Sequence, residues 1–101
     1  MFRTLSLAAL TLVLCVTSAA AKDVIVTIKS FHFMAMDLNI SAGDSVTWKN
    51  LDEEPHTVTG EQLHSGGIDT GGTFTFKFVK PGTYRYRCSI HPQMTGTITV
   101  T

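Results

Sequence analysis

Three side chains near the C-terminal end of the sequence could bind one metal ion: Cys88, His91 and Met94. Their Cys-x2-His-x2-Met spacing places a thiolate, an imidazole and a thioether on a single short loop. Thiolate and thioether sulfur hold Cu(I) well, and imidazole also suits Cu(II). The motif therefore predicts a redox-active copper site, provided that the chain supplies a second histidine.

His56 is the strongest candidate for the second histidine. It follows a polar turn over 50–55 and begins a short extended segment. Loops at one end of a β-sandwich cluster together even when they are far apart in the sequence. His56 could therefore join the loop donors in a site of two imidazoles and one thiolate, with Met94 as a weak axial donor. This ligand set is typical of electron-transfer copper sites.

Two other interpretations of the motif stay open. Cys-x2-His also suits zinc, although structural zinc sites prefer more thiolate ligands and rarely include a thioether. Cys88 could also be a small buried core residue, with His91 and Met94 serving only to fill the loop.

Further residues of similar chemistry lie outside the motif. His32, Met34 and Met36 alternate along one extended segment, where they form either an auxiliary Cu(I) site or ordinary edge and surface positions. His64 is expected to be an exposed loop histidine. The acidic residues at 52–54 are expected to be solvated parts of the turn.

Short strands must position these donors. Alternating apolar residues separated by Gly, Pro, Asn and Asp predict about seven strands. Their ranges are 24–33 (with a bend near 29–30), 38–40, 45–48, 56–59, 74–78, 84–88 and 98–100. No useful helical period is present, so the sequence predicts an all-β, antiparallel sandwich of one domain.

The N-terminal 21 residues are predicted to be a signal peptide. Arg3 precedes an apolar run over 5–16, and the small residues at 19–21 fit a signal cleavage site. The run is shorter than the ~20 residues of a membrane-spanning helix, although a retained N-terminal anchor is a competing interpretation. Cys15 would be removed with the signal.

Cleavage at residue 21 of 101 would leave a domain over 22–101 of 80 residues with no membrane span. Its only cysteine would be Cys88, so no internal disulfide could form, and a single exported thiol is a candidate metal ligand. The whole chain has 8 Lys and Arg against 8 Asp and Glu, and a nucleic-acid partner is not expected from this balance.

The run over 81–100 resembles the C-terminal signature of the cupredoxins, the small blue copper proteins. The segments 43–50 and 56–58 resemble the upstream half of the same family, so the resemblance covers nearly all of 22–101. The short loop with Pro92 after its histidine is most similar to amicyanin, whereas plastocyanin and pseudoazurin have a longer segment before the methionine.

The resemblance implies a Greek-key sandwich with one type 1 copper per chain. It implies that His56 is a buried ligand and that Cys88 provides most of the electronic coupling. His91 would be the partly exposed ligand through which electrons leave, and Met94 the axial donor. Thr57 and Ser89 would link the two ligand loops by hydrogen bonds.

The resemblance also implies a function. The chain is expected to be a monomeric periplasmic electron carrier, with a dehydrogenase as a possible donor and a c-type cytochrome as a possible acceptor. It is not expected to be an enzyme. The alternative is a periplasmic protein that binds or delivers copper for copper tolerance or oxidase assembly.

Overall fold

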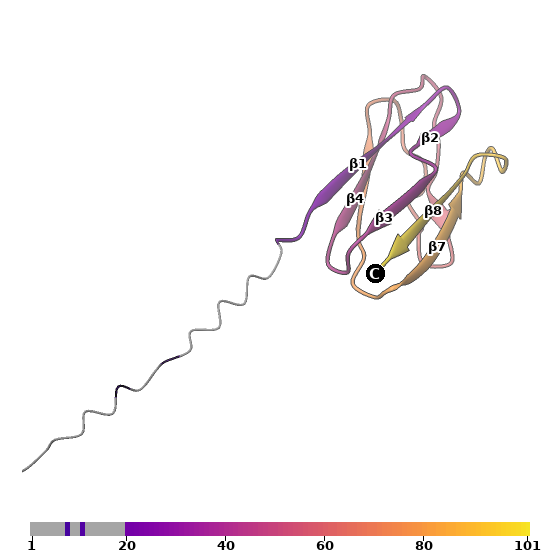
Figure 1. Ribbon diagram of the computed structural model, residues 1–101. Coiled ribbons are helices and arrows are strands. Elements are labelled where there is room, and N and C mark those ends of the chain that lie inside the picture. The colour runs from indigo at the N-terminus through magenta and orange to yellow at the C-terminus, as the bar shows by residue number, and fades with distance from the viewer. Residues whose placement is uncertain (1–7, 9–10, 12–19) are drawn as a thin grey trace, which may run out of the picture.

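The computed structural model describes residues 8, 11 and 20–101 (Figure 1). The predicted signal peptide over 1–21 falls almost entirely on the remaining residues, so its prediction lies outside the described part of the chain. None of the described residues forms a helix with the length and hydropathy to span a bilayer.

Two four-stranded sheets pack face to face. Their strands are β1 (Asp23–Lys29), β2 (His32–Met34), β3 (Asp37–Ile40), β4 (Ser45–Asn50), β5 (Thr59–Gly60), β6 (Thr73–Lys77), β7 (Gly82–Arg87) and β8 (Thr95–Val100). The first sheet has the order β2-β1-β4-β6 and the second the order β3-β8-β7-β5. The all-β sandwich predicted from the sequence is therefore confirmed.

The pairing within the sheets is mixed, and in this respect the expectation of an antiparallel sandwich was incomplete. β1 pairs with β4 in parallel, and so does β3 with β8. The chain leaves the first sheet after β2, forms β3 at the edge of the second sheet, and returns as β4 beside β1. This crossing of the sandwich gives the parallel pairs, because parallel neighbours require a crossover connection.

The core lies between the sheets and follows the alternation of the sequence. Trp48, Phe33 and Phe78 are its largest fully buried side chains. The Tyr86 ring packs edge-on against Trp48 at 5.3 Å between centroids and against Phe33 at 4.8 Å. At the corner before β7, the Tyr84 hydroxyl donates a hydrogen bond to a backbone carbonyl four residues upstream, at 2.6 Å. These contacts form a rigid base for the loops above them.

Two details of the backbone differ from what the sequence predicted. The predicted bend near 29–30 is a tight turn at Ser30–Phe31 between β1 and β2, where both residues have positive φ (53° and 59°). The expected strand over 56–59 is reduced to an isolated bridge at His56 and the short β5, because Val58 exchanges hydrogen bonds with Ser65 instead of with a strand. Both segments lie at the end of the sandwich that also carries the β7–β8 loop (Figure 1).

Candidate metal centre

The structure brings three of the four predicted donors together. The ligand atoms of His56, Cys88 and His91 all lie within 4.8 Å of one another. The Cys88 Sγ atom is 3.7 Å from Nδ1 of His56 and 3.9 Å from Nδ1 of His91. Donors about 2.0–2.3 Å from a shared metal ion, at angles near 110–130°, would be separated by about 3.6–4.0 Å. The observed spacing therefore fits one ion between these atoms.

The β7–β8 loop supplies two of these donors and Met94. Cys88 immediately follows β7, on the face that also carries Tyr84 and Tyr86, as predicted from the period of two. Its amide donates to the Met94 carbonyl at 3.0 Å, and the Met94 amide donates to the His91 carbonyl at 2.9 Å. These bonds close the loop tightly and leave the Met94 side chain buried.

The environment of the Cys88 sulfur favours a thiolate. The backbone amide of Thr57 donates to Sγ at 3.3 Å. Burial alone would raise the pKa of Cys88, but hydrogen bonds to the sulfur, first of all from the Thr57 amide, outweigh burial and lower this pKa from 9.0 to about 6. A thiolate is the form of cysteine that binds metals.

His56 is held by its backbone on the opposite side of the site. It is fully buried, and its amide and carbonyl both bond to Ile68, at 3.2 and 2.7 Å. The Asn50 side chain donates to the Ile68 and Glu54 carbonyls and accepts from the Asp52 amide. This buried amide side chain thus fixes the whole turn that leads to His56.

The His56 ring is also held by a carboxylate. Its Nε2 atom lies 2.8 Å from Oδ2 of Asp52. Burial would raise the pKa of Asp52, but hydrogen bonds from Phe31, His56 and Ser30 outweigh it and lower the pKa below its ordinary value. The expectation that Asp52 is a solvated turn residue was therefore wrong, since it contacts a candidate ligand.

The two ligand loops are joined directly. Thr57 Oγ1 accepts a hydrogen bond from the Ser89 amide at 2.8 Å and lies 3.0 Å from Ser89 Oγ. The linking role predicted for Thr57 and Ser89 is confirmed. Hydrogen bonds of this kind keep metal ligands oriented.

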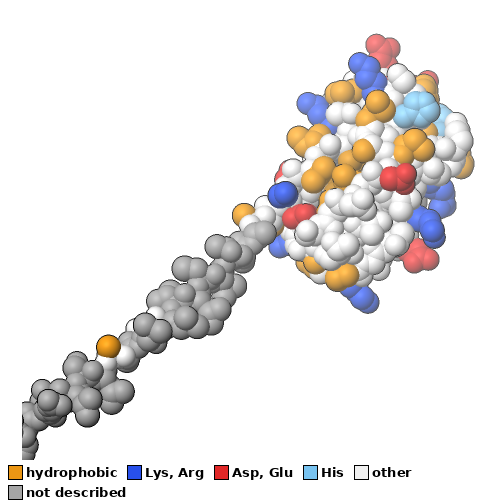
Figure 2. Space-filling model, viewed as in Figure 1, with side chains coloured by type: hydrophobic (Ala, Val, Ile, Leu, Met, Phe, Trp, Pro, Cys, Tyr) orange, Lys and Arg blue, Asp and Glu red, His pale blue; other side chains and the backbone are white. Residues whose placement is uncertain are grey.

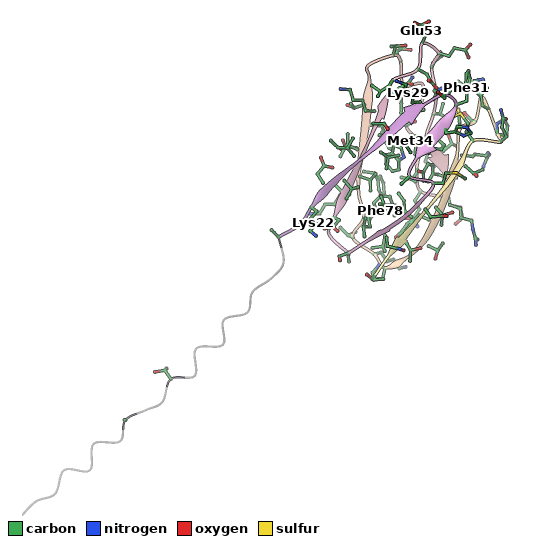
Figure 3. The ribbon with its side chains drawn as sticks, turned by 45° about the horizontal axis from the view of Figure 1, so that its top comes forward. Lys22, Lys29, Phe31, Met34, Glu53 and Phe78 are labelled. Carbon is green, nitrogen blue, oxygen red and sulfur yellow. The ribbon has the colours of Figure 1, made fainter. Side chains whose placement is uncertain are left out.

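His91 is the more open of the two histidines. Its side chain is 24% exposed, and its Nε2 is 3.8 Å from the exposed carboxylate of Glu54. Phe31 packs edge-on against His91 at 5.0 Å and against His56 at 5.3 Å. Phe31 lies at this end of the domain in Figure 3, with Lys22 at the other. In Figure 2, histidine side chains at the surface near this end have hydrophobic side chains beside them.

Sequence reasoning missed Phe31 and the role of Asp52. The spacing of Asp52 and His56, four residues apart, was a weak signal that an acid could reach the ring. Nothing in the sequence indicated that Phe31 would pack against both histidines, because that depends on the unusual turn at Ser30. His32, Met34 and Met36 are all exposed, which leaves their auxiliary-site interpretation open.

Comparisons with known proteins agree with this arrangement. A family model described as "Cupredoxin-like domain" matches residues 3–100. Amicyanin-alpha of Methylorubrum extorquens is 34% identical over 92 residues, covering 84% of this chain and 77% of that protein. Amicyanin of Paracoccus denitrificans is 31% identical and covers 76% of this chain and 64% of that protein. The structure of the Cu(I) form of an amicyanin mutant matches with a TM-score of 0.73 and 28% identity, over 82% of this chain and 86% of that one.

Proposed function

Because the chain belongs to the cupredoxin-like family, we propose that it carries single electrons between redox proteins through one bound copper ion. Family membership and the grouped donors confirm two predictions from the sequence: the resemblance to cupredoxins, amicyanin above all, and copper as the cofactor. The proposed ligands are His56, Cys88, His91 and Met94.

The observation that carries this proposal is the grouping of two imidazole nitrogens and one sulfur within 4.8 Å. Copper bound there would supply reversible one-electron chemistry, since this donor set suits both Cu(I) and Cu(II). Zinc is less favoured because the loop supplies a buried thioether, Met94, and because Cys88 is the one cysteine among the described residues.

The surrounding residues favour electron transfer over bond-making chemistry. Hydrogen bonds between Thr57 and Ser89 hold the ligand loops together, so the donors need to move little when the charge of the site changes. His91 reaches the surface, where Phe31 and Ile90 are both exposed and apolar. A partner that docks on these side chains would come close to His91, which is the proposed exit for the electron.

The location and partners are also part of the proposal. An N-terminal signal would place the mature chain in the periplasm, where a dehydrogenase could donate electrons and a c-type cytochrome could accept them. Separation of periplasmic from cytoplasmic fractions tests the location, and N-terminal sequencing of the purified protein tests cleavage after residue 21.

Titration of the purified protein with Cu(II) tests the function. We expect one copper per chain and an intense visible absorption from thiolate-to-copper charge transfer. A Cys88→Ser variant should lose this absorption while keeping its fold, as judged by circular dichroism. A wild-type protein that stays colourless with Cu(II) would contradict the proposal.

Exposed sulfur and imidazole donors favour a second candidate function, which is the binding or delivery of copper. His32 and Met34 are both exposed on the same face of β2, and Met36 is exposed shortly after it. Uptake of more than one Cu(I) per chain, reduced to one by replacing Met34 and Met36 with leucine, would support this candidate. Uptake of a single copper by both proteins would show that these exposed donors bind no second copper and would remove the observation that favours this candidate.

A further inference from the structure

The carboxylate of Asp52 connects a ligand histidine to the turn between β1 and β2. Its Oδ2 atom lies 2.8 Å from His56 Nε2 and accepts the amide of Phe31 at 3.0 Å. Its Oδ1 atom accepts the amide of Ser30 at 2.6 Å. Both oxygens are thus used, and the three donors come from two separate segments of the chain.

This arrangement sets the protonation pattern of the His56 ring. An ionised carboxylate only accepts hydrogen bonds, so Nε2 of His56 must carry the hydrogen. In the neutral ring, Nδ1 then keeps its lone pair, and this is the atom that lies 3.7 Å from the Cys88 sulfur. With Nε2 engaged by Asp52, Nδ1 is the ring nitrogen that remains available to bind a metal ion.

The same carboxylate supports the turn that carries Phe31. Ser30 and Phe31 have φ values of 53° and 59°, a left-handed conformation that residues other than glycine rarely adopt. The two amide hydrogen bonds to Asp52 compensate for that conformation. In this position the Phe31 ring packs edge-on against both histidines.

We infer that Asp52 is a positioning residue of the copper centre. It fixes His56 in the tautomer that binds through Nδ1, and it holds Phe31 against both imidazoles. Its negative charge also favours Cu(II), the more highly charged form of the ion, over Cu(I). This inference rests on the proposed function and names a residue that tunes the same site.

An Asp52→Asn variant tests the inference. An amide side chain has one acceptor oxygen and cannot accept from Ser30, Phe31 and His56 as a carboxylate does. We expect Cu(II) affinity to fall roughly 10- to 100-fold, as is usual when such a partner of a ligand is lost. The midpoint potential should shift upward, because Cu(II) loses more stabilisation than Cu(I).

The copper-free protein provides a readout that is independent of copper loading. In the wild-type protein, nitrogen NMR should show His56 protonated at Nε2, with slow exchange of the Ser30 and Phe31 amides. In Asp52→Asn the Nε2 tautomer should lose population and both amides should exchange faster. These measurements test the positioning role even if copper uptake fails, which would contradict only the proposed function.

Two control variants distinguish the positioning role of Asp52 from two simpler effects. One is the loss of a carboxylate that only holds backbone amides, and the other is the loss of a negative charge near the site. Asp44 also accepts two backbone amides, from Lys22 at 2.9 Å and Ser41 at 3.0 Å, but at the opposite end of the sandwich. Asp44→Asn should lower stability without changing the potential. Glu53→Gln removes an exposed charge beside Asp52 and should change neither.

Two results would overturn the inference. One is a wild-type His56 protonated at Nδ1 in the copper-free protein, which remains measurable even if Asp52→Asn does not fold. The other is an Asp52→Asn protein whose tautomer, Cu(II) affinity and potential all match those of the wild type.

Discussion

The two histidines of the site are held in very different ways. His56 is fully buried, its backbone bonds twice to Ile68, and its ring contacts the Asp52 carboxylate at 2.8 Å. His91 lies on the β7–β8 loop with its side chain 24% exposed, and its charged neighbour Glu54 is 3.8 Å away and itself exposed. One proposed ligand is thus part of the core, and the other is part of the surface.

This difference separates two demands on an electron carrier. The geometry of the site must persist when its charge changes, and the buried side with Asp52 provides that rigidity. The electron must also reach a partner, and we propose the exposed side as the place of that contact. The shared element is Cys88, whose sulfur lies 3.7 Å from Nδ1 of His56 and 3.9 Å from Nδ1 of His91.

The largest expected effect comes from removing each histidine in turn. His56→Gly leaves a buried cavity and an Asp52 carboxylate without its ring partner, so the unfolding free energy of the copper-free protein should fall by about 3 kcal/mol. His91→Gly should cost less than about 1 kcal/mol, because its side chain is partly solvated. Chemical denaturation of both copper-free variants measures this contrast.

Added imidazole sharpens the same comparison. The gap left by His91→Gly opens to solvent, so free imidazole should enter it and restore the visible absorption of the copper-loaded variant. The cavity left by His56→Gly has no opening to solvent, so free imidazole should not enter it and should not restore the absorption. Equal rescue of both variants, or equal stability losses, would show that the two sides are not held differently.

The next effect is a pH dependence centred on the shared sulfur. The folded, copper-free protein has a Cys88 pKa of about 6, against 9.0 for an ordinary thiol. Between these values the unfolded chain binds more protons than the folded one, so stability should rise with pH. This contribution is complete above pH 9, decreases as pH falls, and is lost below pH 6.

Urea denaturation of the copper-free protein at several pH values measures this dependence, and ultraviolet absorbance of the thiolate reports the titration directly. Cys88→Ser should remove the dependence between pH 6 and 9. A thiolate signal that appears only near pH 9 in the folded protein would contradict the assigned environment of the sulfur.

A defect in the core should lower stability while leaving the positions of both histidines unchanged. A Cβ atom on Gly96 would overlap the ring of Tyr86, which is fixed by Trp48 and Phe33. Gly96→Ala should therefore lower the unfolding free energy by about 1–3 kcal/mol. The visible absorption of the remaining folded, copper-loaded protein should be unchanged. Altered absorption would mean that the site depends on the core beneath it more than on its loops.

The smallest effect is expected at Glu54. Its carboxylate is exposed and lies 3.8 Å from His91, so Glu54→Gln should change stability by less than about 0.5 kcal/mol. Midpoint potentials of this variant and of Asp52→Asn, measured side by side, compare the two acids directly. A larger shift of the midpoint potential for Glu54→Gln than for Asp52→Asn would contradict the conclusion that His56, and not His91, is the tightly held histidine.

Much of this fold and site could be predicted from the sequence. Alternation placed Tyr84, Tyr86 and Cys88 on one strand face, because side chains of a strand alternate strictly between two faces. His56 could be placed near Cys88 because loops at one end of a sandwich cluster. The parallel pairing of β1 with β4 was not predicted, since alternation does not encode the order of strands in a sheet.

The surroundings of the ligands were harder to predict. Asp52 and Glu53 look alike in the sequence, yet Asp52 bonds to His56 and to a distant turn whereas Glu53 is exposed. The difference depends on the left-handed turn at Ser30 and Phe31. Glycine or asparagine usually indicates such a turn in a sequence, and neither residue is present at these positions. Contacts made by unusual backbone conformations between distant segments have no local pattern.

Voltammetry of the copper-loaded wild-type protein tests the central claim most directly. A carrier whose site is fixed by His56 and opened to partners at His91 should give one reversible one-electron wave, with no loss of copper over repeated cycles. An irreversible wave, or release of copper on reduction, would contradict the account and show that the site does not retain the ion in both oxidation states.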